Sequence, residues 1–299
     1  MPSSQATSRA CARRRLAGRG LAALAALGGS MGGLFIRHVE DAGVWQILFY
    51  RSVAFSILVA LFLLTARWLG KSGGRAMPTP TVIVAAMSLA LAFILYVFSV
   101  QATTVGNVVL ILSAAPFVIA LLSVVVLKAR VPVSTWAFIA VGVSGVLVIV
   151  VDDMMVRFDE GIVYATLTML TYSLFIVLLK ADGRVDMMMA TFLAGVFAAV
   201  ISFALADGLV MTGNDLRFAV SLGIVQIGVQ YIFITIASRM IRAEEIALVL
   251  LLEVILAPLW VFLAFGETLS AATLLAAPLI LLAVAGQAVT ALWRERRAR

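Results

Sequence analysis

Residues 243–265 read AEEIALVLLLEVILAPLWVFLAF, a long apolar run that contains one carboxylate, Glu253, and one proline, Pro258, in its interior. A helix needs about 20 apolar residues to cross the hydrocarbon core of a bilayer. Runs of this length are typical of transmembrane segments and rare in soluble domains. The stretch therefore predicts a transmembrane helix with an ionisable group inside it.

Nine further runs have the same character, so we expect an all-α membrane protein with ten transmembrane helices. Composition agrees, because 64% of the residues are hydrophobic and only 12% are charged, whereas soluble domains carry about 25% charged residues. No polar stretch between the runs is long enough for a soluble domain. The predicted helices span residues 20–37, 44–66, 79–100, 104–127, 132–151, 161–179, 188–206, 218–238, 243–265 and 270–292.

Lysine and arginine residues are distributed unevenly between the connecting segments, which predicts the orientation in the membrane. With a cytoplasmic N-terminus, 18 of the 22 basic residues fall on the cytoplasmic side, including those in the basic tails 1–19 and 293–299. Both termini are therefore predicted to be cytoplasmic, in the inner membrane of a bacterium. This placement accounts for the net charge of +7, so we expect no nucleic-acid partner.

Two weak sequence similarities share nearly the same offset along the chain. Residues 33–36 (GLFI) resemble residues 173–176 (SLFI) at an offset of 140, and residues 124–130 (VVVLKAR) align with residues 262–268 (FLAFGET) at an offset of 138. The chain is thus predicted to consist of two repeats of five helices. Since five is odd, the second repeat starts on the opposite side of the membrane. Inverted repeats of this kind are typical of secondary transporters, with the substrate site near the midplane between them.

The two predicted repeats span residues 20–151 and 161–292, and their motifs resemble those of a known family. The second repeat contains Leu252-Glu253, Pro258 and Gly266-Glu267, and the first contains Arg51 after Phe49-Tyr50, Thr103-Thr104-Val105 and Pro116. This pattern is similar to the EamA-type members of the drug/metabolite transporter superfamily. The first repeat departs from it at Lys128-Ala129, where the family has a Gly-Glu pair. The resemblance implies a proton- or gradient-linked permease, often an exporter, for amino acids, vitamins or related metabolites.

Two charged residues inside predicted helices are the strongest candidates for a transport site. A carboxylate at mid-membrane costs about 2.5–3.5 kcal/mol on insertion scales, and such residues commonly face the bundle interior. Glu253 is therefore expected to contact the substrate or to exchange the coupling proton, or else to be a buried acid that serves packing alone. Arg51 also has two interpretations, because its stem could reach the headgroups or its guanidinium could bind an anionic group of the substrate.

Other polar and aromatic residues are weaker candidates for the same site. Gln226 and Gln230 are four residues apart, so they share one face of a helix. The remaining candidates for substrate contact are Asn107, Tyr96, Tyr172, Tyr231 and Trp260. Anchoring at the membrane interface is the competing interpretation for the aromatic residues.

Pro116 and Pro258 are candidates for hinges. Each removes a backbone donor within a predicted helix. Interrupted helices in corresponding places of two repeats point to the binding site of a transporter. The competing interpretation is that proline is common in membrane helices in general.

Enzymatic functions lack the residues they would need. Residues 142–145 read GVSG, as around the serine of a rhomboid protease, but the sole histidine, His38, lies at the outer end of the first predicted helix. That chemistry needs a histidine base beside the serine. No HExxH, GxxxxGK[ST] or GxGxxG motif occurs, so we expect no metal, nucleotide or other cofactor.

The sequence thus predicts a secondary active transporter of a small metabolite, in which one five-helix unit rocks against the other. Amino acids are the leading substrate class, and uptake of a planar vitamin such as riboflavin is the alternative. A flippase for lipid-linked substrates and a membrane sensor that binds a ligand without moving it are further alternatives. The expected partners are the solute and the lipid bilayer, and a homodimer is left open.

Overall fold

The fold is that of a computed structural model of the 299-residue chain. The structure describes residues 2–36, 38–69, 79–102, 108, 111–112, 114–151, 160–180, 187–265 and 271–297. Regular elements within these ranges are all helical: α1 (Pro2–Ser30), α2 (Gly32–Ile36), α3 (Val44–Trp68), α4 (Pro80–Ala102), α6 (Ala115–Leu127), α7 (Val133–Val151), α8 (Glu160–Leu178), α9 (Met188–Leu205), α10 (Gly213–Ser221), the π-helix η1 (Leu222–Val229), α11 (Gln230–Ser238), α12 (Ala243–Leu250), α13 (Leu252–Phe265) and α14 (Ala271–Arg297).

Most of these helices have the length and apolar character of membrane spans. Among the described residues, seven stretches are long and apolar enough to cross a bilayer: Arg13–Ile36, Val44–Trp68, Pro80–Ala102, Glu160–Leu178, Met188–Leu205, Gly213–Ser238 and Glu245–Ala264. Three more are apolar but shorter: Ala115–Leu127, Val133–Ser144 and Pro278–Gln287. Each predicted span overlaps one of these stretches. The count of ten transmembrane helices stays a prediction, because three of the stretches are shorter than a span requires.

The outward faces of the helices are apolar. Exposed side chains on these faces include Ile57, Leu64, Met87, Leu91, Val125, Val200, Phe203 and Leu282. A contiguous apolar surface of this kind marks a membrane-facing or partner-facing region. Together with the apolar helices, it indicates that the chain is a multi-pass membrane protein.

Helices of the first half pack on helices of the second half in a symmetric way. If the two halves are exchanged, the same set of helix pairs results. By chain order, α1–α2 corresponds to α8, α3 to α9, α4 to α10–η1–α11, α6 to α12–α13, and α7 to α14. Accordingly α4 packs on α8 as α11 packs on α1, and α6 packs on α8 as α12 and α13 pack on α1. Corresponding helices also pair directly, namely α3 with α9, α6 with α12, and α7 with α14. The two halves therefore interleave, and simple rocking of one five-helix unit against the other would have to separate these pairs.

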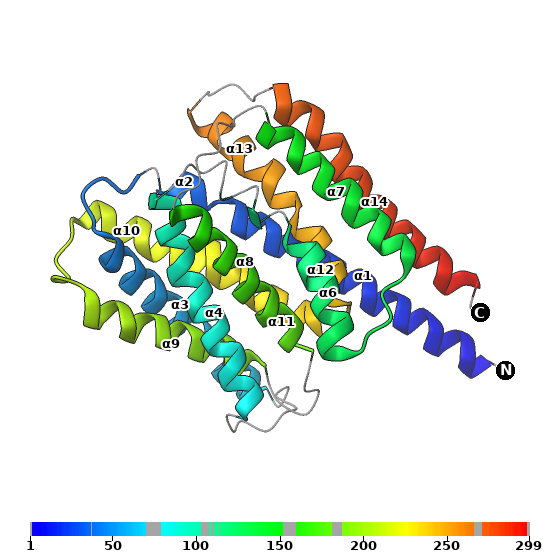
Figure 1. Cartoon of the computed structure of the whole chain (residues 1–299). Helices are drawn as coiled ribbons and strands as arrows, with labels where there is room; N and C mark the ends of the chain where they lie inside the picture. The colour runs from blue at the N-terminus through cyan, green and yellow to red at the C-terminus, as the bar shows by residue number, and fades with distance from the viewer. Residues whose placement is uncertain are drawn as a thin grey trace.

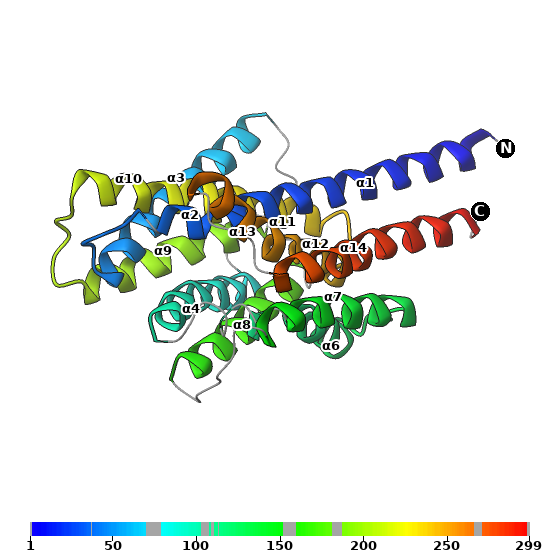
Figure 2. The same ribbon diagram turned by 90° about the horizontal axis from the view of Figure 1, so that it is seen from above.

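Two layers are visible when the molecule is turned to be seen from above (Figure 2), with α4, α6, α7 and α8 in one and α1, α2, α13 and α14 in the other. Both ends of the chain lie at the same end of the bundle (Figure 1), where the outer turns of α1 and α14 project beyond the other helices. We call this the terminal end. The α7–α14 pair runs along one side of the molecule in Figure 1.

Three of the apolar stretches are interrupted in their backbone. Met31 separates α1 from α2, Leu251 separates α12 from α13, and η1 lies between α10 and α11. At the first two points the turn is tightened, because Met31 N donates to Gly28 O and Leu251 N donates to Leu248 O, both at 3.2 Å. Single π-helical segments inside α-helices are frequent at functional sites. These three irregular segments therefore mark candidate positions for a functional site.

The sequence predicted one uninterrupted helix over each of residues 20–37, 218–238 and 243–265, and the structure differs at these points. At Leu251 the local sequence gives no warning, since neither glycine nor proline occurs there. Leu251 instead belongs to a small apolar core with side chains of α6, α7 and α14. Tertiary packing thus sets the position of this interruption.

We predict that Gly223→Ala lowers the stability of the protein. A Cβ at Gly223, in η1, would lie 2.8 Å from Ala54 Cβ and 3.1 Å from the carbonyl carbon of Arg51. Backbone cannot rotate away as a side chain can, so the overlap is expected to cost about 1–3 kcal/mol. The thermal midpoint of the purified protein in detergent reports the effect.

Gly20→Ala is the matched control for this substitution. Nothing lies within 4 Å of a Cβ at Gly20, and alanine in a helix is favoured over glycine by about 0.5–1 kcal/mol. The control is therefore expected to keep or raise the midpoint. Equal midpoints for the two variants would contradict the close packing of η1 on α3.

Candidate functional site

Glu253 lies in the first turn of α13, directly after the interruption at Leu251. Its Oε1 accepts a hydrogen bond of 2.5 Å from Nε2 of Gln230, the first residue of α11. Gln230 is 8% exposed and Glu253 is half-buried. The bond therefore joins two helices of the second half inside the bundle.

Helix α1 approaches this pair closely because it presents glycine there. A Cβ at Gly29 would lie 2.8 Å from Glu253 Cδ, and a Cβ at Gly32 would lie 3.2 Å from Gln226 Cγ. Gln230 thus faces α1 at Gly29, and Gln226 faces α2 at its first residue, Gly32. Any side chain beyond hydrogen at the two glycines would displace these polar groups.

Gln226 lies in η1 and has an unused acceptor. Its Oε1 is buried and has no hydrogen-bond partner among the residues that the structure describes. A buried acceptor without a partner costs about 1–3 kcal/mol. Gln226 is therefore available to accept a hydrogen bond from a ligand donor.

Aromatic rings gather around Tyr231, which follows Gln230 in α11 and is 7% exposed. The ring centroid of Tyr231 lies 5.1 Å from that of Phe93, 5.8 Å from Phe175, 6.2 Å from Phe55 and 6.4 Å from Tyr172. Most of these pairs are edge to face, the favoured arrangement of aromatic rings. The rings come from α3, α4, α8 and α11, so this cluster lies inside the bundle, where the two layers meet.

Arg51 is buried in the same region, with 3% of its side chain exposed. Its Cζ lies over the ring of Phe93, 5.5 Å from the centroid, and its Nε has no hydrogen-bond partner among the described residues. Within the described part of the chain, no carboxylate forms an ion pair with it. The side chain of Arg51 is thus enclosed by protein in this structure.

Arg51 and Glu253 form no ion pair with each other in the described chain, but Phe93, Tyr231 and Gln230 connect them, and Tyr96 lies one turn after Phe93 in α4. Tyr172 joins the same group through its ring contact with Tyr231. We call Arg51, Tyr96, Tyr231, Gln230 and Glu253 the central cluster. It offers a buried cation, a carboxyl group and aromatic faces to one small region.

Trp260 ties α13 to the end of α1. Its Nε1 donates to Ser30 Oγ at 2.8 Å, and Ser30 Oγ donates to Leu27 O at 2.8 Å. Trp260 is half-buried, and its polar atom is already bonded. Its arrangement fits a structural tie between two interrupted helices at the level of the central cluster.

The remaining predicted residues lie elsewhere or outside the description. Pro116 is buried at the start of α6, where a missing N–H leaves no gap in the helix. Pro258 lies within α13, seven residues after the interruption at Leu251, and its side chain is outside the described residues. Asn107 is also outside them. The hinge role of both prolines stays a prediction.

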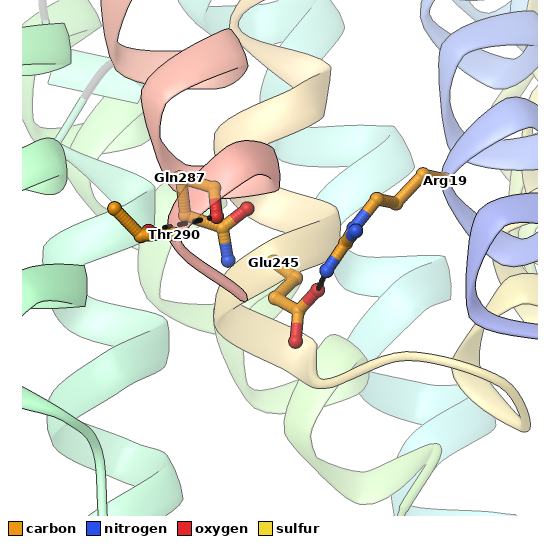
Figure 3. A network of polar contacts seen from close by, with 4 residues as sticks. All are labelled: Arg19, Glu245, Gln287 and Thr290. Carbon is orange, nitrogen blue, oxygen red and sulfur yellow. Dashed lines mark hydrogen bonds and ion pairs between the residues drawn. The ribbon is translucent and has the colours of Figure 1, made fainter. Parts of the chain in front are cut away.

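Sequence reasoning missed an ion pair between Arg19 of α1 and Glu245 of α12 (Figure 3). Arg19 Nη2 lies 3.0 Å from Glu245 Oε2, and both side chains are 7% exposed. Arg19 was counted among the basic residues of the N-terminal tail, and no role was assigned to Glu245. Their separation of 226 positions leaves no local pattern that could have paired them.

Sequence reasoning also missed Asp215, a residue near the start of α10. Its side chain is only 1% exposed. Its carboxylate accepts bonds from the backbone N–H of Glu40 at 3.1 Å and of Asp41 at 3.3 Å. Thr212 caps the same helix by accepting from Asp215 N. A threonine three residues before an acid is a known helix-start signal that could have flagged this site.

A shallow groove lies on the outer face between α3 and the α10–η1 segment. Its walls are almost entirely apolar, and they are formed by Tyr50, Val53, Ala54, Ile57, Leu58, Leu61, Val220 and Ile224. Such walls suit a lipid chain and offer nothing to hold a polar solute. The central cluster is therefore the better candidate for binding a small metabolite.

Comparison with known proteins agrees with the fold. The EamA-like transporter family matches residues 16–151 and again residues 159–287. One solved crystal structure is similar with a TM-score of 0.76 and 19% sequence identity, over 95% of this chain and 99% of that chain. At this identity the likeness concerns the fold. No curated protein matches the sequence significantly.

We predict that Arg51→Met leaves the stability of the protein within about 1 kcal/mol or raises it, because it removes a buried cation that has no ion-pair partner in the described chain. Loss of the contact with Phe93 offsets part of this gain. Thermal unfolding in detergent measures the change.

Arg19→Met is the matched control, since the same substitution there strands Glu245 as a buried charge. It is expected to cost about 3–5 kcal/mol. If Arg51→Met were as destabilising as Arg19→Met, Arg51 would have a strong structural partner, and its availability to a ligand would be disproved.

Proposed function

The chain belongs to the EamA-like transporter family, and on that premise we propose that it is a secondary active transporter of a small polar metabolite in a bacterial inner membrane. The proposed mechanism is alternating access, driven by a gradient. The central cluster carries the proposal, because a chain of contacts joins a buried cation to a carboxyl group: Arg51 lies over Phe93, Phe93 contacts Tyr231, and the adjacent residue, Gln230, bonds to Glu253. Charges inside a membrane bundle mark ion and substrate pathways.

The proposed architecture is ten helices in two inverted five-helix repeats with both termini in the cytoplasm. The symmetric helix pairing supports the repeats. Both ends of the chain lie at the terminal end of the bundle (Figure 1), which supports an even number of crossings. The interruption before α13 and the start of α6 are 137 residues apart, close to the repeat offset. Interrupted helices in corresponding places are expected beside a transport site.

Amino acids are the proposed substrate class. A guanidinium binds a carboxylate through a two-pronged pair of hydrogen bonds, and Arg51 supplies this group. An ammonium group needs an acceptor such as the carboxylate of Glu253, with Gln226 Oε1 as a second acceptor nearby. A zwitterion would satisfy both ends of the cluster at once. Its side chain would meet the rings around Tyr231.

Glu253 is also the proposed site of proton coupling. A carboxyl group that binds either a proton or the ammonium of the substrate makes the two compete for one position. Competition of this kind couples the flow of one to the flow of the other, because each is released when the other binds. Gln230 holds the carboxyl group in place through its Nε2.

A planar vitamin is the alternative substrate, and the aromatic rings around Tyr231 favour it. Stacking on such rings does not require a zwitterion, so it would depend little on Arg51. A labelled flavin belongs in the same transport assay as the amino acids. The dependence on Arg51 then separates the two substrate classes.

We predict that the protein, reconstituted in liposomes, catalyses counterflow of a labelled neutral amino acid. Arg51→Met is expected to remove this counterflow. Glu253→Gln is expected to reduce accumulation driven by a proton gradient about tenfold or more, since a hydrogen bond to a charged group is worth about 1.5–3 kcal/mol.

Asp207→Asn is the matched control for the carboxylate, because Asp207 is exposed in the link after α9. It should transport as the unmodified protein does. Accumulation by Glu253→Gln that still follows the proton gradient would rule out the coupling role. Counterflow of flavin without counterflow of amino acids would make the planar vitamin the substrate. Binding of a solute without counterflow of any solute would favour a membrane sensor.

A further inference from the structure

The bundle is packed more tightly around α12 than around α13. All described side chains of α12 are buried, and so is Leu251. The described side chains from Leu252 to Trp260 in α13 are only half-buried. Since α12 lies toward the terminal end and α13 away from it (Figure 1), the bundle is closed at the terminal end and looser beyond the central cluster.

An ion pair lies in the middle of the closed part. Arg19 of α1 donates to Oε2 of Glu245 through Nη2 at 3.0 Å and through Nε at 3.3 Å. Figure 3 shows the two side chains meeting between α1 and α12, with Gln287 projecting from α14 toward the same region. Gln287 is itself 4% exposed. The pair therefore joins the first half of the chain to the second in a buried place.

Neighbouring contacts hold α1 against the turn between α11 and α12. Arg14 Nη2 donates to Arg239 O at 3.2 Å. A Cβ at Gly18 would lie 2.7 Å from Met240 Cβ, so the two segments are in close contact. Arg19 is the next residue along α1. These contacts hold α1 against the turn next to the ion pair.

The ion pair lies between the central cluster and the terminal end. Arg19 precedes Gly29 by ten residues of α1, which is about 15 Å at 1.5 Å per residue. Glu245 precedes Glu253 by eight residues, which is about 12 Å on the same basis. A solute in the central cluster would have to pass this level to leave at the terminal end.

We propose that Arg19 and Glu245 form a gate, which closes the terminal end in this conformation and separates when the central cluster opens to that end. The inference rests on alternating access in the proposed function. An ion pair suits a gate because its charges attract strongly in a dry interior. Once water enters, each separated charge is solvated, so opening is far less costly than breaking the pair in a dry bundle.

The gate is tested by thiol accessibility, which needs no substrate. Cys11 is the single native cysteine, so Cys11→Ser gives a background without thiols. Ala22→Cys then serves as the reporter, because Ala22 is 0% exposed and lies one turn inward from Arg19. A membrane-impermeant thiol reagent is added to the face of proteoliposomes that carries the termini, identified by protease cleavage of a C-terminal tag.

We predict slow labelling of the reporter in the parent and labelling faster by about tenfold or more in Glu245→Gln and in Arg19→Gln, because each removes one side of the lock. The double variant Arg19→Glu with Glu245→Arg restores the pair in reverse and is expected to restore slow labelling.

Asp207→Asn is the control, because Asp207 is exposed and far from the ion pair in the chain. Its reporter should be labelled at the same rate as in the parent. Gel filtration of each variant verifies its folding, and Glu245→Met replaces Glu245→Gln if the latter does not fold.

Unchanged labelling in the single variants would overturn the gate and leave the pair as a static tie. Fast labelling in the reversed double variant would also overturn it, because the effect would then not depend on the ion pair. Failure of the proposed function has a different signature, since it appears as absent counterflow in the transport assay. Accelerated labelling without counterflow would keep the gate and reject the transport of the solutes assayed.

Discussion

Backbone hydrogen bonding in a medium without water is the constraint on which this structure depends. Each unpaired N–H or C=O in hydrocarbon costs several kcal/mol, so segments that face lipid must be regular helices. Irregular backbone is tolerated only in the protein interior. Accordingly the interruptions at Met31 and Leu251 and the π-helix η1 all lie beside the contact of α1 with Gln230 and Glu253. The position of the polar site follows from the places where the backbone is allowed to be irregular.

Two arginines that are buried in the described part of the chain, Arg19 and Arg51, have different partners. Arg19 is matched by Glu245 on a helix that packs against it, and the pair holds two halves of the chain together. Arg51 lies against an aromatic ring, with no carboxylate paired to it in the described part of the chain. A buried charge without a partner is unfavourable for folding alone. Local conflicts of this kind are expected at functional sites, where stability is given up for binding.

Sequence patterns located the helices and the charged residues, and they failed where distant contacts decide the outcome. Glu253 stands out because a single carboxylate within an apolar run is visible in one dimension. The interruption before it is not visible, since Leu251 breaks the helix through packing against α6, α7 and α14. The predicted hinge at Pro258 stays a prediction, and the backbone has a further interruption at Leu251 that the sequence did not indicate. Arg19 and Glu245 could not be paired, because no periodicity links residues on helices so far apart.

The two halves of the chain have the same helix pairing but different chemistry along their central helices. Helix α1 is the common partner of α11, α12 and α13, and it meets them through an ion pair, Gly29 and the Ser30–Trp260 bond. Helix α8 is the corresponding partner of α4 and α6, and it carries Tyr172 and Phe175 toward Tyr231. The helices around α1 thus present carboxyl and amide groups, and the helices around α8 present mainly aromatic rings. A solute with a polar end and an apolar end would therefore have one preferred orientation between them, which two chemically identical halves could not impose.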